Sequence, residues 1–144
     1  MDEFNLSRFI AAQAQGVYAS ALAELQHGRK VGHWMWFIFP QLKGLGHSAT
    51  SEYYGISNLD EAVAYLADAV LGARLMQCTE TLLLLPGHSA EALLGYPDNL
   101  KLLSSLTLFE QAAGQDGTFT AALDKYYQGQ RDQKTLALLR HAKA

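Results

Sequence analysis

Apolar residues recur every three or four positions over most of this chain, between residues that cap and end helices, and this pattern constrains the fold most strongly. In residues 7–27 the recurring positions are Ile10, Ala14, Val17, Ala21, Leu22 and Leu25. Residues at this spacing lie on one face of a 3.6-residue helix. Gly28 and the basic pair after it are typical of a helix C-terminus. We therefore predict one helix over residues 7–27.

The same reasoning predicts helices along the rest of the chain. Asn58 and Glu61 form a capping-box pattern, and Pro86-Gly87 ends the helical stretch that follows, which we expect to bend near Val70. Later helices are expected over 90–94, 97–113, 118–127 and 132–141, with no linker long enough to divide the chain. The sequence thus predicts a mainly α fold, a compact bundle of about six or seven helices in a single domain spanning residues 1–144.

Residues 34–39 are six large apolar residues in a row, and Pro40 follows them. Such a run fits a buried strand or a short buried helix, and periodicity does not distinguish the two. One short extended segment is therefore left open in the fold. Residues 41–55 contain Gly44, Gly46 and Gly55 without a clear period, which is typical of a loop.

Composition excludes several classes of protein. Hydrophobic residues make up 49% of the 144 positions and charged residues 17%, which indicates a packed globule. A net charge of −3 without a basic stripe argues against nucleic-acid binding. No apolar stretch approaches the roughly 20 residues of a membrane helix, and the acidic start does not resemble a signal peptide. We expect a cytoplasmic protein that binds neither nucleic acid nor membranes.

Motifs for metals and common cofactors are absent from the sequence. Cys78 is the single cysteine, and no cysteine or histidine pair has the spacing of zinc ligands. Neither the phosphate-loop order nor the dinucleotide-binding glycine order occurs. We therefore expect no metal site and no cofactor. Nothing in the pattern indicates an oligomeric state.

Two segments in the first half combine cations, aromatic rings and glycines in a way that a plain core does not require. Residues 29–34 place Arg29, Lys30 and His33 beside Trp34, so that cations for an anion lie next to a ring for a base. Alternatively the cations end a helix and the indole fills the core. Residues 41–48 carry several polar side chains between glycines, and they form either a ligand-binding loop or a plain surface loop.

Two further segments could carry chemistry. Glu52 precedes two tyrosines and is either a general base or a solvated residue at a turn. Asp98, Lys101 and Ser105 share one face of a predicted helix, whose N-terminus favours an anion. The alternative for this helix is that its hydroxyls bond to its own carbonyls while it packs against a neighbour.

The run HWMWFIFPQ at residues 33–41, with GLG at 44–46 and YGI at 54–56, resembles a bacterial family known as a domain of unknown function. Members are sometimes labelled calpastatin, although that inhibitor is a disordered chain and this composition is globular. The resemblance spans nearly the whole chain and implies a compact, mainly helical fold without an established activity. A more distant similarity is to the NADAR group, helical proteins associated with N-glycosidic chemistry on NAD and ADP-ribose. It lies in the order of an early aromatic segment with a glutamine, a helix ending in Phe109, and a late Asp132.

Our leading hypothesis is a polar pocket for a nucleotide-like or ribosyl ligand, with N-glycoside hydrolysis as the candidate reaction. Such hydrolysis needs a carboxylate near an oxocarbenium-like centre, and Glu52 and Asp98 are the carboxylates within the unusual motifs. The candidate ligand-binding residues are His33, Trp36, Gln41, Lys43, Ser48, Tyr54, Arg74, Lys101 and Ser105. The alternative is a non-catalytic binding or interaction domain in which the tryptophan-rich segment forms part of the core. The first hypothesis requires residues 41–52 and 98–105 to line one concavity.

Overall fold

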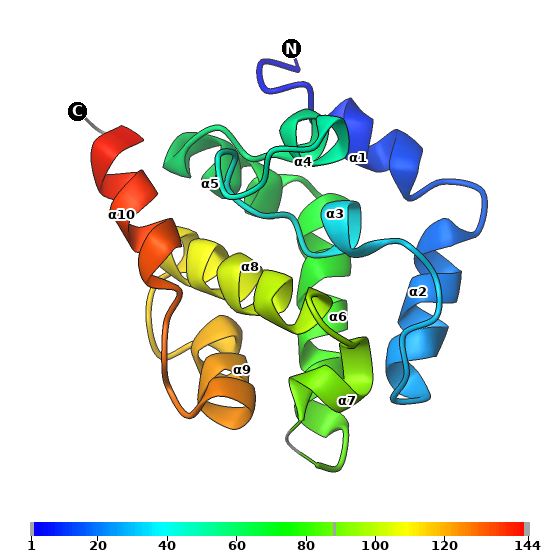
Figure 1. Cartoon of the computed structure of the whole chain (residues 1–144). Coiled ribbons are helices and arrows are strands. Elements are labelled where there is room, and N and C mark those ends of the chain that lie inside the picture. Colours follow the sequence, from blue (N-terminus) through cyan, green and yellow to red (C-terminus); the bar gives the residue numbers. More distant parts are fainter. Residues whose placement is uncertain (1, 88, 143–144) are drawn as a thin grey trace.

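The computed structural model describes residues 2–87 and 89–142, and within these ranges the helices and strands assigned are all helices (Figure 1). The helices in this part of the chain are α1 (Ser7–Ala12), α2 (Val17–Gln26), α3 (Met35–Ile38), α4 (Ala49–Tyr54), α5 (Leu59–Ala67), α6 (Leu71–Leu84), α7 (Ala90–Leu94), α8 (Asp98–Ala113), α9 (Thr118–Tyr127) and α10 (Gln133–Ala142). Over the same ranges, extended pairing is limited to one bridge between Leu42 and Ile56. The prediction of an α fold is confirmed.

Helix α8 lies at the centre of the arrangement. It packs against α5, α7, α9 and α10 and contacts α3, while α6 packs against α2, α5 and α9 (Figure 1). Aromatic rings connect these layers: Tyr65 of α5 lies 5.1 Å from Phe9 and 5.3 Å from Phe109, and Phe109 lies 5.9 Å from Phe119 of α9. All four side chains are buried, so α8 is held by rings on both sides.

The predicted count of six or seven helices is wrong, because the described ranges contain ten. Residues 7–27 form two helices, separated by a turn that ends at Gly16 in the left-handed conformation (φ 84°). In this turn Gln13 is buried and donates its side-chain amide to the carbonyl oxygen of Phe37 at 2.7 Å. The break thus coincides with a long-range contact, at a point where local periodicity would continue the helix.

Two more helices and one more break add to the count. The run at 34–39 contains the short helix α3, so the extended segment left open by the sequence is not present there. The predicted loop over 41–55 contains α4, capped by Ser48, whose hydroxyl accepts from the Ser51 N–H at 3.1 Å. The stretch 57–85 is two helices, because the Asp68 carboxylate accepts the N–H groups of Val70 and Leu71 and starts α6 anew.

Gly72 allows α6 to begin close against the end of α5. A Cβ built at this position would lie 2.1 Å from the carbonyl oxygen of Leu66. No side chain fits at that distance from backbone, so a glycine is required where the two helices meet. The turn at Asp68 and the small residue at Gly72 together explain why one predicted helix is two.

Arg8 connects the N-terminal segment to α4 and α5 through hydrogen bonds of its guanidinium group. Its guanidinium donates to four carbonyl oxygens and one carboxylate, those of Phe4, Asn5, Tyr53, Gly55 and Glu61. The ion pair with Glu61 measures 2.7 Å, and both side chains are buried. Because all five N–H donors of an arginine are used, the buried charge is fully compensated.

The hydroxyl-bearing side of α8 anchors the segment that leads into α10. Ser104 donates to the Asp132 carboxylate at 2.7 Å, and Thr107 accepts the Asp132 N–H at 3.0 Å. Thr107 also donates to the Leu103 carbonyl of its own helix at 2.8 Å. These hydroxyls therefore join two segments of the protein and do not face an open site.

Candidate functional site

Each of the two tryptophans at the start of α3 has a lysine ammonium over its ring. We call Trp34 with Lys30 the Trp34 pair and Trp36 with Lys101 the Trp36 pair. In the Trp34 pair the lysine Nζ lies 5.2 Å from the ring centroid, and in the Trp36 pair 4.2 Å. Both distances are within the range of a cation–π interaction.

The Trp34 pair is closed off from solvent and fixed by hydrogen bonds. The indole is 3% exposed, and its Nε1 donates to the carboxylate of Glu24 at 2.8 Å. The same carboxylate oxygen accepts the N–H groups of Val31 and Gly32. Burial alone would raise the pKa of Glu24, but these three donors outweigh it and lower the pKa. Glu24 is therefore ionised and holds the turn before α3 in place.

The Trp36 pair is more open. The Trp36 side chain is half-buried, and Lys101 is 23% exposed at its place on α8. Lys101 has one acceptor among the described side chains, the Asp98 carboxylate at 3.0 Å. An ammonium has three donors, so Lys101 keeps capacity for another anion.

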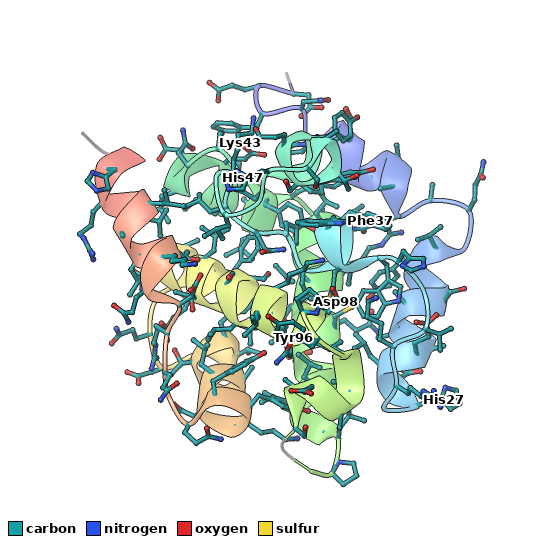
Figure 2. The ribbon with its side chains drawn as sticks, viewed as in Figure 1. His27, Phe37, Lys43, His47, Tyr96 and Asp98 are labelled. Atoms are coloured by element: carbon teal, nitrogen blue, oxygen red, sulfur yellow. The ribbon has the colours of Figure 1, made fainter. Side chains whose placement is uncertain are left out.

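Asp98, labelled in Figure 2, lies in the first turn of α8 and contacts the lysines of both pairs. One carboxylate oxygen contacts Lys30 at 2.8 Å and the other contacts Lys101 at 3.0 Å. Burial would raise the pKa of Asp98, but the two ammonium groups outweigh this and lower the pKa. The carboxylate is therefore ionised near neutral pH, and the three side chains together carry one net positive charge.

Trp36 also walls a small hollow between α3, α4 and the loop before α4. Its lining consists of Trp36, Gln41, Leu42, Leu45, Gly46, Ser51, Tyr54 and Gly55. The enclosed volume is about 10 Å³, which is close to the minimum for one water molecule. The site is therefore closed in this conformation, and a larger ligand requires a side chain or the loop to move.

Two buried polar side chains in this region lack a hydrogen-bond partner within the described structure. They are Gln41, through Nε2, and Ser105, through its hydroxyl. Gln41 lines the hollow, and Ser105 lies one turn beyond Lys101 on the same face of α8. Buried polar groups are nearly always bonded, so an unpaired donor beside a hollow is an informative exception. Asn99 is also unpaired at Oδ1, but it lies two residues from Lys101, about 160° away around the helix.

The structure brings together Trp36, Gln41, Tyr54, Lys101 and Asp98 from the predicted set. It places the exposed residues of that set elsewhere on the surface: His33 before α3, Lys43 on the loop, and Glu52 on α4. Figure 2 shows Lys43 and His47 on the loop in front of α5, apart from Asp98.

Two other candidates serve local structure. Ser48 caps α4, as described above. Arg74 lies over the ring of Tyr18 at 4.8 Å and donates to the Gln13 side chain at 3.2 Å. Gln13 in turn bonds to α3, so Arg74 supports that helix from the side of α6.

Lys30 and Glu24 were not among the candidate site residues, although both position the tryptophans. Lys30 did give a signal, since residues 29–34 place it among the cations beside Trp34. Glu24 gives no comparable signal: it is one acidic residue on a helix, and its three partners lie seven to ten residues later.

Two larger cavities lie away from these residues, whereas a third, of about 330 Å³ beside Arg8, includes Lys43 and Gly55. One of about 460 Å³ is bordered by the end of α2, the turn after α6 and Tyr126. Another of about 480 Å³ surrounds the ion pair of Glu110 with Arg131. Neither includes a residue of the predicted set.

Within residues 2–87 and 89–142, no three His, Cys, Asp or Glu side chains lie close enough together to hold a metal ion. In the same part of the chain, no helix combines the length and hydropathy needed to cross a bilayer.

Comparisons with known proteins agree with the fold. The model of the family described as "Protein of unknown function (DUF1810)" matches residues 3–139. The crystal structure of the conserved hypothetical protein Rv1873 from Mycobacterium tuberculosis matches with a TM-score of 0.93 and 52% sequence identity. The match covers 96% of this chain and 99% of that one. No curated protein matches the chain. Neither match involves the NADAR group, so that similarity stays a prediction.

Proposed function

We propose, from the premise that this chain belongs to the DUF1810 family, that it binds a small nucleotide-like or ribosyl ligand where α3 meets the first turns of α8. One observation carries the proposal: an ammonium covers a half-buried indole that also walls a hollow with an unpaired amide. These are Lys101, Trp36 and Gln41.

Each of these groups fits one part of a nucleotide-like ligand. The face of Trp36 offers a stacking surface for a base. Lys101 offers a cation for a phosphate, because its charge is only partly satisfied by Asp98. The Gln41 amide and the Ser105 hydroxyl are suited to sugar hydroxyls, since each lacks a partner in the closed state.

Binding must open the hollow, since its volume of about 10 Å³ excludes any nucleotide. Two parts of the site can move to admit a ligand. Lys101 has a long side chain with several accessible rotamers. The loop before α4 is exposed at Lys43 and Gly44, and Gly44 has a left-handed φ of 103°. A ligand would therefore enter by displacing the lysine, the loop or both.

We extend the proposal to hydrolysis of an N-glycosidic bond, with Asp98 as the principal carboxylate. Asp98 touches the ammonium that covers Trp36, whereas Glu52 is exposed on α4 and stays the second choice. Because its pKa is lowered, Asp98 is a weak proton acceptor, and its role would be to stabilise the positive charge of an oxocarbenium-like transition state.

A non-catalytic binding or interaction domain is the second candidate function. The burial of Trp34 (3% exposed) and Phe39 (0% exposed) favours this function, because these two residues of the tryptophan-rich segment belong to the core. Under either function we propose that residues 1–144 act as one domain.

The test is a thermal-shift screen of the wild-type chain with NAD, ADP-ribose, nucleosides and flavin precursors. A ligand that binds only the folded state raises Tm. We expect at least one of these compounds to raise Tm, and Trp36→Leu to abolish the rise. Leu84→Gln is the matched control, because Leu84 is 86% exposed at the end of α6. No shift with any compound, or an equal shift in Trp36→Leu, would overturn the proposed site.

For the reaction, release of the free base from a bound compound is measured by chromatography. Asp98→Asn should lower the turnover rate by roughly a hundredfold or more, as expected for a carboxylate at the reacting centre. Glu52→Gln should leave the rate near that of wild type. Binding without release in the wild type would favour the second candidate function.

A further inference from the structure

We infer that Lys101 makes the site selective for ligands that combine a planar ring with an anionic group, because its ammonium occupies the ring face that such a ligand needs. This inference rests on the proposed function and names the class of ligand within it. It follows from the position of Lys101, which contacts the centre of the indole and a carboxylate at the same time.

If an uncharged ring bound here, Lys101 would lose more contacts than it gained. To stack on this face of Trp36, it must move the Lys101 ammonium from its place 4.2 Å above the ring. That movement removes a cation–π contact and disturbs the 3.0 Å ion pair with Asp98. A nucleoside offers no anion in return, so the displaced charge is left to solvent.

A ring that carries a phosphate compensates for the same displacement. The phosphate can receive the ammonium as it leaves the indole, in a charge-assisted hydrogen bond. Asp98 does not lose its neutralisation, because Lys30 remains 2.8 Å from its other oxygen and is only 8% exposed. The two lysines therefore have different roles: Lys30 holds the carboxylate, and Lys101 is free to change partners.

An anion without a ring is expected to bind poorly for a different reason. It could contact Lys101 only where the ammonium already lies, beside the negative charge of Asp98. Ribose 5-phosphate would gain only a partly exposed ion pair with Lys101 and no stacking on Trp36, so its contacts are too few for tight binding. Selectivity should thus require both halves of the ligand.

The experiment measures binding of AMP, adenosine and ribose 5-phosphate by isothermal titration calorimetry. Wild type should bind AMP roughly tenfold more tightly than adenosine, and ribose 5-phosphate more weakly than AMP. In Lys101→Met, which keeps the length without the charge, the AMP-to-adenosine ratio should fall to about one. Lys101→Arg should retain the preference. Lys134→Met is the matched control, since Lys134 is exposed on α10.

A second measurement avoids any variant. In wild type, the preference for AMP should shrink as salt rises from low to about 0.5 M, since ions screen the phosphate contact. Binding of both compounds with an unchanged ratio in Lys101→Met, or a salt-independent preference, would overturn this inference alone. Absence of binding by all three compounds to wild type would overturn it together with the nucleotide form of the proposed function.

Discussion

Each of the two tryptophans at the start of α3 has a lysine ammonium over its ring, but the surroundings of the two rings differ. Trp34 is buried, its nitrogen is bonded to Glu24, and its lysine is nearly enclosed. Trp36 is half-buried, and its lysine comes from another helix and is partly exposed. The same chemical pair is therefore structural in one place and available in the other. Exposure and the number of fixed hydrogen bonds distinguish the two, and residue type does not.

The largest effect should come from truncating the two indoles. Trp34→Ala removes a buried ring and should lower the free energy of unfolding by about 3–5 kcal/mol. Trp36→Ala should cost less than half as much, because that ring keeps solvent contact in the native state. Urea denaturation of both variants measures this. Equal losses would show that Trp36 is as much a core residue as Trp34.

Glu24→Gln should destabilise the protein by about 1–3 kcal/mol, since three N–H donors lose a charged acceptor. The wild type should show a matching pH dependence. The folded pKa of Glu24 is lowered, so its contribution is complete above the unfolded value of about 4.5 and is lost as pH falls through the folded pKa. Denaturation at pH 7 and at lower pH checks the sign: the difference between wild type and Glu24→Gln should shrink in acid.

Replacing each lysine shows how much the lysine of each pair contributes to the free energy of unfolding. Lys30→Met deprives both Asp98 and the Gly32 carbonyl of a partner in a nearly enclosed place, so we expect a loss of about 1–2 kcal/mol. Lys101→Met should cost under about 1 kcal/mol, because the lysine is more exposed. Chemical denaturation of both variants is the measurement. The reverse order would contradict the division of roles between the two lysines.

The smallest effect is spectroscopic and changes no stability. Acrylamide should quench the emission of Trp36 and leave that of Trp34 largely unaffected, since only Trp36 has solvent contact. Quenching curves of wild type should show two components, and Trp36→Phe should remove the accessible one. A single component in wild type would mean that the two rings have similar access to solvent.

Much of the fold follows from the sequence because capping and periodicity are local. Asn58 and Ser89 cap their helices as expected, each accepting the N–H three residues later. The break between α1 and α2 could not be predicted in this way. It accompanies a bond from Gln13 to the backbone of Phe37, 24 residues away, which no local pattern encodes.

The candidate site was predicted in part for the same reason. Asp98 and Lys101 share a face of a regular helix, and the structure keeps them together. Residues 41–52 have no period, so the sequence could not show that Gln41 turns inward while Lys43 and Glu52 face solvent. The Leu42–Ile56 bridge and α4 set these directions, and the bridge joins two segments that no local pattern pairs.

The contacts of Arg8 bear on how far this protein can be shortened. A chain that begins after this position would leave the Glu61 carboxylate, only 3% exposed, without its cation. Isolating one partner of such an ion pair typically costs about 3–5 kcal/mol, a large share of the stability of a domain of this size. The opening residues thus belong to the cooperative folding unit, and trimmed versions should be far more susceptible to proteases than the intact polypeptide.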